Sequence, residues 1–147
     1  MKSKKLSSGT RQTTFVLVLE DGEEAFATIT DFARRENIGG ASLTAIGAFS
    51  GATVGWFDFG GRTYRRIAVD QQCEVLSLLG DLAEGEDGKP SLHIHAVLGL
   101  SDGTTRGGHF LDGVVHPTLE VTLVETPVNL RRRKHAELGI ALIDLSD

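Results

Sequence analysis

The sequence predicts an α+β fold, a mainly antiparallel sheet with one long N-terminal helix packed on it. Most of the chain consists of short β-branched or alternating runs joined by glycine-containing turns, which is typical of antiparallel neighbours. Only one stretch, near the start, has its apolar residues at helical spacing. Since strands and helices do not alternate, a parallel βαβ order is not expected. With 147 residues, the chain is long enough for one domain with its own core.

Residues 1–12 are basic and polar, and we expect them to form a disordered N-terminal arm before a folded domain at 13–147. The arm lacks the apolar centre of a secretory signal, and no run approaches the roughly 18 apolar residues of a membrane span. The single cysteine, Cys73, excludes an internal disulfide and is expected to be a small buried residue. These features fit a cytoplasmic protein.

The run at 13–20, TTFVLVLE, predicts the first strand of the domain. Asp21 is then expected to cap a helix, with Glu24 completing a capping box. Apolar residues at helical spacing, with arginines in the last turn and Asn37 and Gly39 after it, predict that the helix packs on the sheet and ends near residue 36. The apolar face comprises Ala25, Phe26, Ile29, Phe32 and Ala33.

The remaining strands follow from apolar runs between turn residues. Ser50-Gly51 and Gly60-Gly61 are the expected turns between the first three of these runs. The segment 81–89, DLAEGEDGK, is expected to be an acidic loop covering the approach to the next hairpin. Residues 127–138 are polar and predict no regular element. The expected strands lie at 41–49, 52–59, 62–69, 73–79, 117–126 and 139–145.

Four of the five histidines lie between Ser91 and Glu120. His93 and His95 are two residues apart in an apolar run, so both side chains should emerge on the same face of a strand. Ser101-Asp102-Gly103 suits a three-residue hairpin loop closed by glycine at positive φ. If Leu100 then opposes Thr104, His95 lies across from His109 and three imidazoles converge.

Two alternatives would separate the histidines. A two-residue loop on Asp102-Gly103 would place His109 on the other face, and a bulge at Gly107-Gly108 would also change the parity. Three neutral imidazoles with one open position suit Zn²⁺ above all and other divalent metals as well. The competing interpretation is that these histidines are hydrogen-bonded packing residues. His116 and His135 are expected to be ordinary surface or loop residues.

Glu74 is the candidate catalytic carboxylate. On a regular strand it shares a face with Leu76 and Leu78, and a carboxylate there needs a partner. Arg65 or Arg66 could provide an ion pair, and the alternative role is that of a general base.

The net charge of −5 disfavours a broad nucleic-acid surface, because phosphate binding needs concentrated positive charge. Two local basic segments, 2–11 and 131–134, leave room for a limited contact. Solvated surface charge is the alternative interpretation of both.

Several motifs in order resemble the PPC domain shared by plants and prokaryotes. They are CEVLSLLGD at 73–81, SLHIHAVLG at 91–99 and DGTTRGGHFLDGVVHPTLEVTL at 102–123, and the resemblance extends over about residues 13–145. It implies a compact α+β fold that assembles as a homotrimer. Plant members carry AT-hooks and bind DNA, but this chain has no R-G-R-P hook. Prokaryotic members share an H-x-H and later G-G-H pattern, matched by His93, His95 and His109, which resembles a metal site near a subunit interface.

Two functions therefore compete. One is a homotrimeric PPC protein whose histidines bind a divalent metal and which acts on DNA or a protein partner. The other is a small metal-dependent enzyme of hydrolase or lyase type acting on an unknown small molecule, with Glu74 or Asp112 moving protons. A third interpretation is that the histidines bind no metal and fix the trimer.

Overall fold

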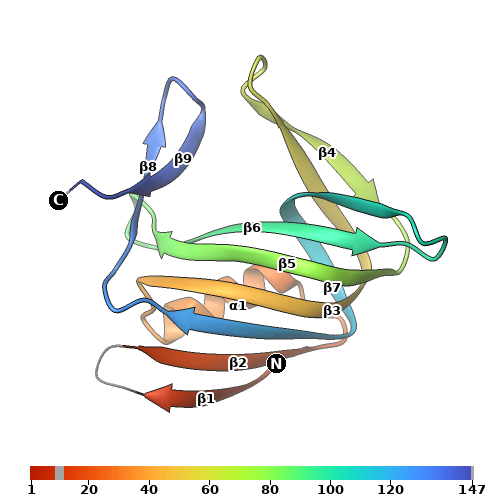
Figure 1. Ribbon diagram of the computed structural model, residues 1–147, viewed down its shortest axis with the longest axis horizontal. Coiled ribbons are helices and arrows are strands. Elements are labelled where there is room, and N and C mark those ends of the chain that lie inside the picture. The colour runs from red at the N-terminus through yellow and green to blue at the C-terminus, as the bar shows by residue number, and fades with distance from the viewer. Residues whose placement is uncertain (9–11, 147) are drawn as a thin grey trace.

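The structure, a computed structural model, describes residues 1–8 and 12–146. Within them, one helix packs on a nine-stranded sheet whose order is β1-β2-β7-β3-β5-β8-β9, with β4 on β3 and β6 on β5 and β7 (Figure 1). All strand pairs are antiparallel except a short parallel contact of β5 with β8. The elements are β1 Lys2–Ser8, β2 Thr13–Glu20, α1 Ala25–Arg35, β3 Gly40–Asp58, β4 Thr63–Val69, β5 Cys73–Glu84, β6 Pro90–Gly99, β7 Thr105–Glu125, β8 Arg131–His135 and β9 Ile140–Asp144. The predicted antiparallel α+β class is confirmed.

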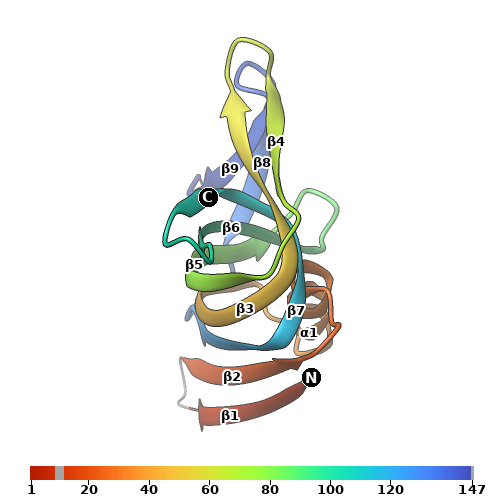
Figure 2. The same ribbon diagram turned by 90° about the vertical axis from the view of Figure 1, so that its right-hand side faces the viewer.

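The main core lies between α1 and one face of the sheet. Ile29 and Phe32 of α1 are buried, and Phe32 meets Phe15 of β2 edge to face with ring centroids 5.3 Å apart. Leu43 and Ile94 add buried side chains from β3 and β6. Since α1 covers this face only, the other face of the sheet stays open, and the two views show the helix on one side of the strands (Figures 1 and 2).

The helix is shorter than the sequence predicted. It has 11 residues and begins after Glu24, whose carboxylate accepts hydrogen bonds from the backbone amides of Phe26 and Ala27. Asp21 is therefore not the N-cap. Gly22 has φ +82°, a conformation outside the helix, so the chain turns there before the first helical residue. The end near residue 36 is as predicted, with Asn37 at φ 54°.

The N-terminal residues also differ from the expectation of a disordered arm. Lys2–Ser8 forms β1 and pairs antiparallel with β2. The terminal amine of Met1 lies 3.0 Å from a carboxylate oxygen of Glu23. Residues 9–11, part of the same predicted arm, lie outside the described residues.

Two strands are longer than the sequence indicated. The predicted turn at Ser50-Gly51 is not a turn, because β3 continues through it to Asp58. Its register with β7 shifts at three places, so bulges absorb the irregular residues without reversing the chain. The strand predicted at 117–126 is the second half of β7. Beyond the sheet, the end of β3 and β4 form a projecting hairpin, visible in Figure 2.

The C-terminal segment differs as well. Residues 131–135, predicted to be irregular, form β8, which pairs with β9 to make a two-stranded ribbon. In Figure 1 this ribbon and the β3–β4 hairpin both rise above the main strands, the ribbon on the left and the hairpin on the right. At 11 residues, α1 falls well short of a bilayer's thickness, and the described residues include no other candidate for a membrane span.

Candidate metal centre

The hairpin joining β6 and β7 has the predicted three-residue loop. The amide of Leu100 donates to the carbonyl of Thr104 at 2.8 Å, and Gly103 has φ +80°. Asp102 holds the turn from inside, since its carboxylate accepts from the amide of Thr104 at 2.9 Å. The resulting register places His95 directly opposite His109, as predicted.

All three imidazoles lie on the sheet face that α1 does not cover. Leu92, Ile94 and Ala96 alternate with the histidines of β6 and are buried, so His93 and His95 point the other way. The ring centroids of His93, His95 and His109 are 5.1 to 5.4 Å apart. One nitrogen from each ring can be chosen so that all three lie within 4.8 Å of one another.

The separation of His93 and His95 suits a metal. Their Nε2 atoms are 3.3 Å apart. Two nitrogens that bind one tetrahedral zinc at 2.0–2.1 Å are about 3.3–3.4 Å apart. The two side chains therefore have the spacing of adjacent zinc ligands, and a ligand nitrogen of His109 lies within 4.8 Å of both.

Burial favours the uncharged, metal-binding form of two of the three imidazoles, His109 and His93. It lowers the pKa of His109 from 6.5 to about 4, and the positive potential of His93, His95 and Arg132 acts in the same direction. Burial also lowers the pKa of His93, with a smaller effect of Arg132. Both imidazoles are therefore uncharged at neutral pH, which is the state that binds metals.

His109 also has an unsatisfied atom. Its Nδ1 is buried and has no hydrogen-bond partner within the described part of the chain. Such atoms are rare in folded proteins, because a buried polar group without a partner loses the hydrogen bond that water would give it. A cation bound among the three rings would offer such a nitrogen a partner. The donor set of three imidazoles, one of which carries this orphaned nitrogen, fits a divalent metal such as zinc.

Three further residues adjoin the cluster that the sequence did not single out. Asp81 lies opposite His93 on β5, with its Oδ2 4.0 Å from His93 Nδ1. Arg132 of β8 is ion-paired with the other oxygen of Asp81, and its side chain is only 4% exposed. Tyr64 of β4 stacks on His109 with ring centroids 4.7 Å apart. The sequence had marked Asp81 only as part of CEVLSLLGD and Arg132 only as part of the basic segment 131–134, and no pattern pointed to Tyr64.

The structure does not place Glu74 with the histidines. A bulge at Leu76 and Ser77 changes the parity of β5, so Val75 and Leu78 are buried while Glu74 and Leu76 are exposed. Glu74 therefore does not lie on a buried apolar face as expected. It is five residues along β5 from Leu79, the partner of His95, or roughly 15 Å away.

The other candidate proton carrier, Asp112, is engaged elsewhere. Its carboxylate accepts from the guanidinium of Arg66 at 2.7 Å on the surface. His116 and His135 lie outside the cluster and face Asp21 at 2.7 Å and Glu137 at 3.2 Å. Cys73 is buried as predicted, at 2% exposure, and burial raises the pKa of its thiol.

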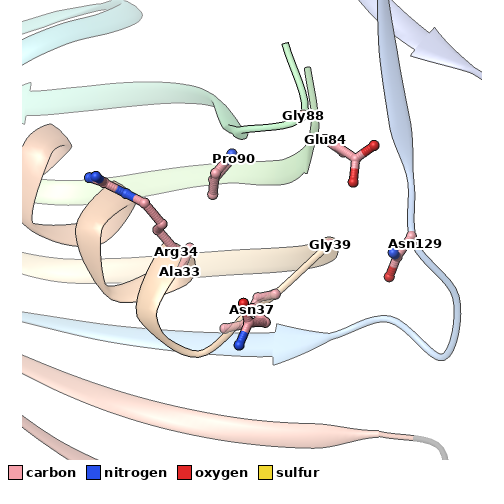
Figure 3. A pocket seen from close by; sticks show the side chains of 9 residues that line it. Ala33, Arg34, Asn37, Gly39, Glu84, Gly88, Pro90 and Asn129 are labelled. Atoms are coloured by element: carbon pink, nitrogen blue, oxygen red, sulfur yellow. The ribbon is translucent and has the colours of Figure 1, made fainter. Parts of the chain in front are cut away.

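The most enclosed of the cavities near α1 is separate from this centre. It has a volume of about 210 Å³ and lies between the C-terminal end of α1, the loop before β6 and Asn129 (Figure 3). None of its lining residues is a histidine, and the only lining charges are Arg34 and Glu84. It offers no ligand set comparable to the imidazole cluster.

The basic segment at 131–134 is largely neutralised. Arg131 lies 3.8 Å from Glu84, Arg132 pairs with Asp81, and Arg133 lies 2.7 Å from Asp144. Lys134 carries a side-chain charge beside them, and its backbone amide donates to Glu86. The interpretation as a solvated run is wrong for Arg132, which is buried.

These features define a class: a single-helix antiparallel α+β domain with a three-histidine cluster on its uncovered sheet face. Residues 6–127 match the model of the Plants and Prokaryotes Conserved (PCC) domain. The chain belongs to this family, which is also written PPC. No curated protein matches the chain in a sequence comparison.

Three solved structures are similar to this chain in sequence and in fold. A PPC protein of Pyrococcus horikoshii is 28% identical, with 91% of this chain and 92% of that chain covered and a TM-score of 0.84. A metal-containing protein of Archaeoglobus fulgidus is 30% identical, with 88% and 91% covered and a TM-score of 0.82. A Ralstonia eutropha protein named a "putative DNA-binding protein" is 29% identical, with 97% and 96% covered and a TM-score of 0.85.

Proposed function

We propose that this protein binds one divalent metal ion, zinc above all, through His93, His95 and His109. The observation that carries the proposal is the 3.3 Å separation of the Nε2 atoms of His93 and His95, opposite a third imidazole with an orphaned buried nitrogen. The similar Archaeoglobus protein, which is described as metal-containing, supports it.

A metal held by three imidazoles keeps an open position, where it can lower the pKa of a bound water or polarise a carbonyl group. That chemistry suits a small metal-dependent enzyme acting on a small molecule, the second candidate function. The chain's own contribution is to hold three imidazoles on one hairpin, two of them kept uncharged by burial. If protons are transferred there, Glu74 and Asp112 are poorly placed, since one is remote and the other is paired with Arg66.

The test starts with elemental analysis of protein purified without a polyhistidine tag. We expect one equivalent of metal for each chain, or uptake of one Zn²⁺ by the metal-free protein with a rise in melting temperature. His95→Ala should abolish both responses, whereas His116→Ala, outside the cluster, should leave them unchanged. No metal and no thermal shift with Zn²⁺, Ni²⁺, Mn²⁺ or Fe²⁺ would remove the proposal.

We also propose that the protein assembles as a homotrimer. The number three comes from the resemblance to the PPC domain, and self-association is supported by an exposed apolar patch on the strands that carry the cluster and their neighbours. The patch comprises Ile46, Leu76, Leu79 and Val97, which are 61%, 55%, 54% and 42% exposed. Side chains of this size grouped on one face mark interaction surfaces more often than chance exposure. Light scattering should report three times the 15.8 kDa chain mass.

DNA binding is the remaining family-based candidate. The similar Ralstonia protein, by its name, favours it. The ion pairs of Arg131, Arg132 and Arg133 leave little free positive charge on β8, which weighs against a strong phosphate contact. Titration of duplex DNA at low and moderate salt tests DNA binding, because absence of a complex at low salt excludes this role.

A cytoplasmic setting accords with the buried, unpaired Cys73.

A further inference from the structure

We infer that Asp81 is a positioning residue that orients His93 for the metal, and that Arg132 holds Asp81 in that position. The inference rests on the proposed metal site and adds two residues to it. Neither residue offers an atom to the three-histidine group itself.

The two ring nitrogens of His93 face different partners. Its Nε2 lies 3.3 Å from His95 Nε2, inside the cluster, and its Nδ1 lies on the side of the Asp81 carboxylate at 4.0 Å. An imidazole that binds a metal through Nε2 must carry its proton on Nδ1. A carboxylate beside Nδ1 accepts that proton in a hydrogen bond and so selects the required tautomer. A movement of roughly 1 Å converts the present contact into such a bond.

The strand register fixes this arrangement. Asp81 and His93 are direct cross-strand partners on β5 and β6, so their side chains leave the sheet on the same face. Asp81 follows Gly80, where an added Cβ would lie 2.1 Å from the carbonyl oxygen of His93. The close approach of the two strands at Gly80 thus brings the carboxylate to the ring.

Arg132 supplies the second restraint. It is the one charged residue among those described that is buried, with 5% of its surface exposed. Its guanidinium donates to Asp81 Oδ1, which leaves Oδ2 directed toward His93. The pair also neutralises itself, so the carboxylate orients the ring without adding net negative charge to the cluster. Through this contact the β8–β9 ribbon is anchored at the metal site.

Removing Asp81 alone would leave Arg132 buried without its partner, which destabilises proteins strongly. The decisive comparison is therefore between Arg132→Met and the double variant Asp81→Asn/Arg132→Met, which differ only in the carboxylate. Zinc affinity is measured by competition with a chromophoric chelator on tag-free, metal-free protein. We expect the double variant to bind Zn²⁺ about 10- to 100-fold more weakly than Arg132→Met.

A second readout reports the tautomer. In metal-free wild type at neutral pH, long-range ¹H–¹⁵N correlation spectra should show His93 protonated on Nδ1, and in the metal-free double variant the same resonances should show loss of that preference. A purely structural role for Asp81 would change the melting temperature of the metal-free protein and leave the tautomer as it is.

The outcomes separate this inference from the proposed function. If wild type fails to bind Zn²⁺, the proposed function itself is wrong. If wild type and Arg132→Met bind and the double variant binds equally well with the same His93 tautomer, the positioning role is overturned and the metal site stands. Should Arg132→Met fail to fold, the tautomer of His93 in the metal-free wild type still decides, since protonation on Nε2 there would contradict the inference.

Discussion

Replacing His109 with phenylalanine should stabilise the metal-free protein while abolishing its response to metal. The substitution removes a buried nitrogen that has no hydrogen-bond partner among the described residues, and phenylalanine can keep the stacking on Tyr64. An unsatisfied buried polar atom destabilises a protein by about 1–3 kcal/mol, and the substitution removes this loss. The larger phenylalanine ring crowds its neighbours, which destabilises the variant by about 1 kcal/mol. We expect a net gain of about 1 kcal/mol at pH 7, or a rise of about 3 °C in melting temperature for a domain of this size.

The same variant should also change the pH dependence of stability. Because burial lowers the pKa of His109 from 6.5 to about 4, the unfolded chain binds a proton there between these values while the folded chain does not. The wild type therefore loses stability as the pH falls from 6.5 toward 4. After allowance for the solvent around a partly exposed ring, the loss at pH 5 is about 1 kcal/mol. The advantage of the variant should widen by that amount.

The assay is urea unfolding followed by circular dichroism at pH 7 and pH 5, with chelator present and at fixed protein concentration. His116→Phe is the matched control, since His116 is exposed and lies outside the cluster. A variant less stable than wild type at pH 7, or an advantage that narrows at pH 5, would refute the view of His109 as a neutral, unsatisfied ligand.

Two further predictions concern the scaffold and the assembly. Gly108→Ala places a Cβ 2.5 Å from the carbonyl oxygen of Gly55, so β3 and β7 must separate beside His109. We expect a clear fall in melting temperature and weaker zinc binding. The control Gly60→Ala should be near neutral, because its Cβ meets only the Asp58 side chain at 3.3 Å. Leu76→Glu introduces charge into the apolar patch and should reduce the mass measured by light scattering, while Val128→Glu, at 67% exposure outside the patch, should not. An unchanged mass for Leu76→Glu would separate this patch from self-association.

Several features could be predicted from the sequence because they depend on local chemistry. Gly103 supplies the positive φ that the hairpin loop needs, and that single choice sets the register of His95 and His109. The alternation in β6 places His93 and His95 on one face. These two local rules were sufficient to predict the cluster.

Other features depend on contacts that no local pattern contains. The bulge at Leu76 and Ser77 is an adjustment to both neighbouring strands, and it buries Leu78 while Glu74 and Leu76 stay on the exposed face, against the regular alternation expected. Asp81 and Arg132 are 51 residues apart, so their pairing follows from where β8 lies. Asp21 and Glu24 could each cap a helix. The chain turns at Gly22, where φ is positive, so the helix begins later and Glu24 is the N-cap.

The central claim is that three imidazoles hold one metal ion. X-ray absorption of the zinc-loaded, tag-free protein tests it most directly, because scattering from imidazole rings reveals their number. We expect nitrogen or oxygen ligands at about 2.0–2.1 Å with scattering from three histidines. A spectrum with fewer than three imidazoles, or with a sulfur ligand from Cys73, would contradict it.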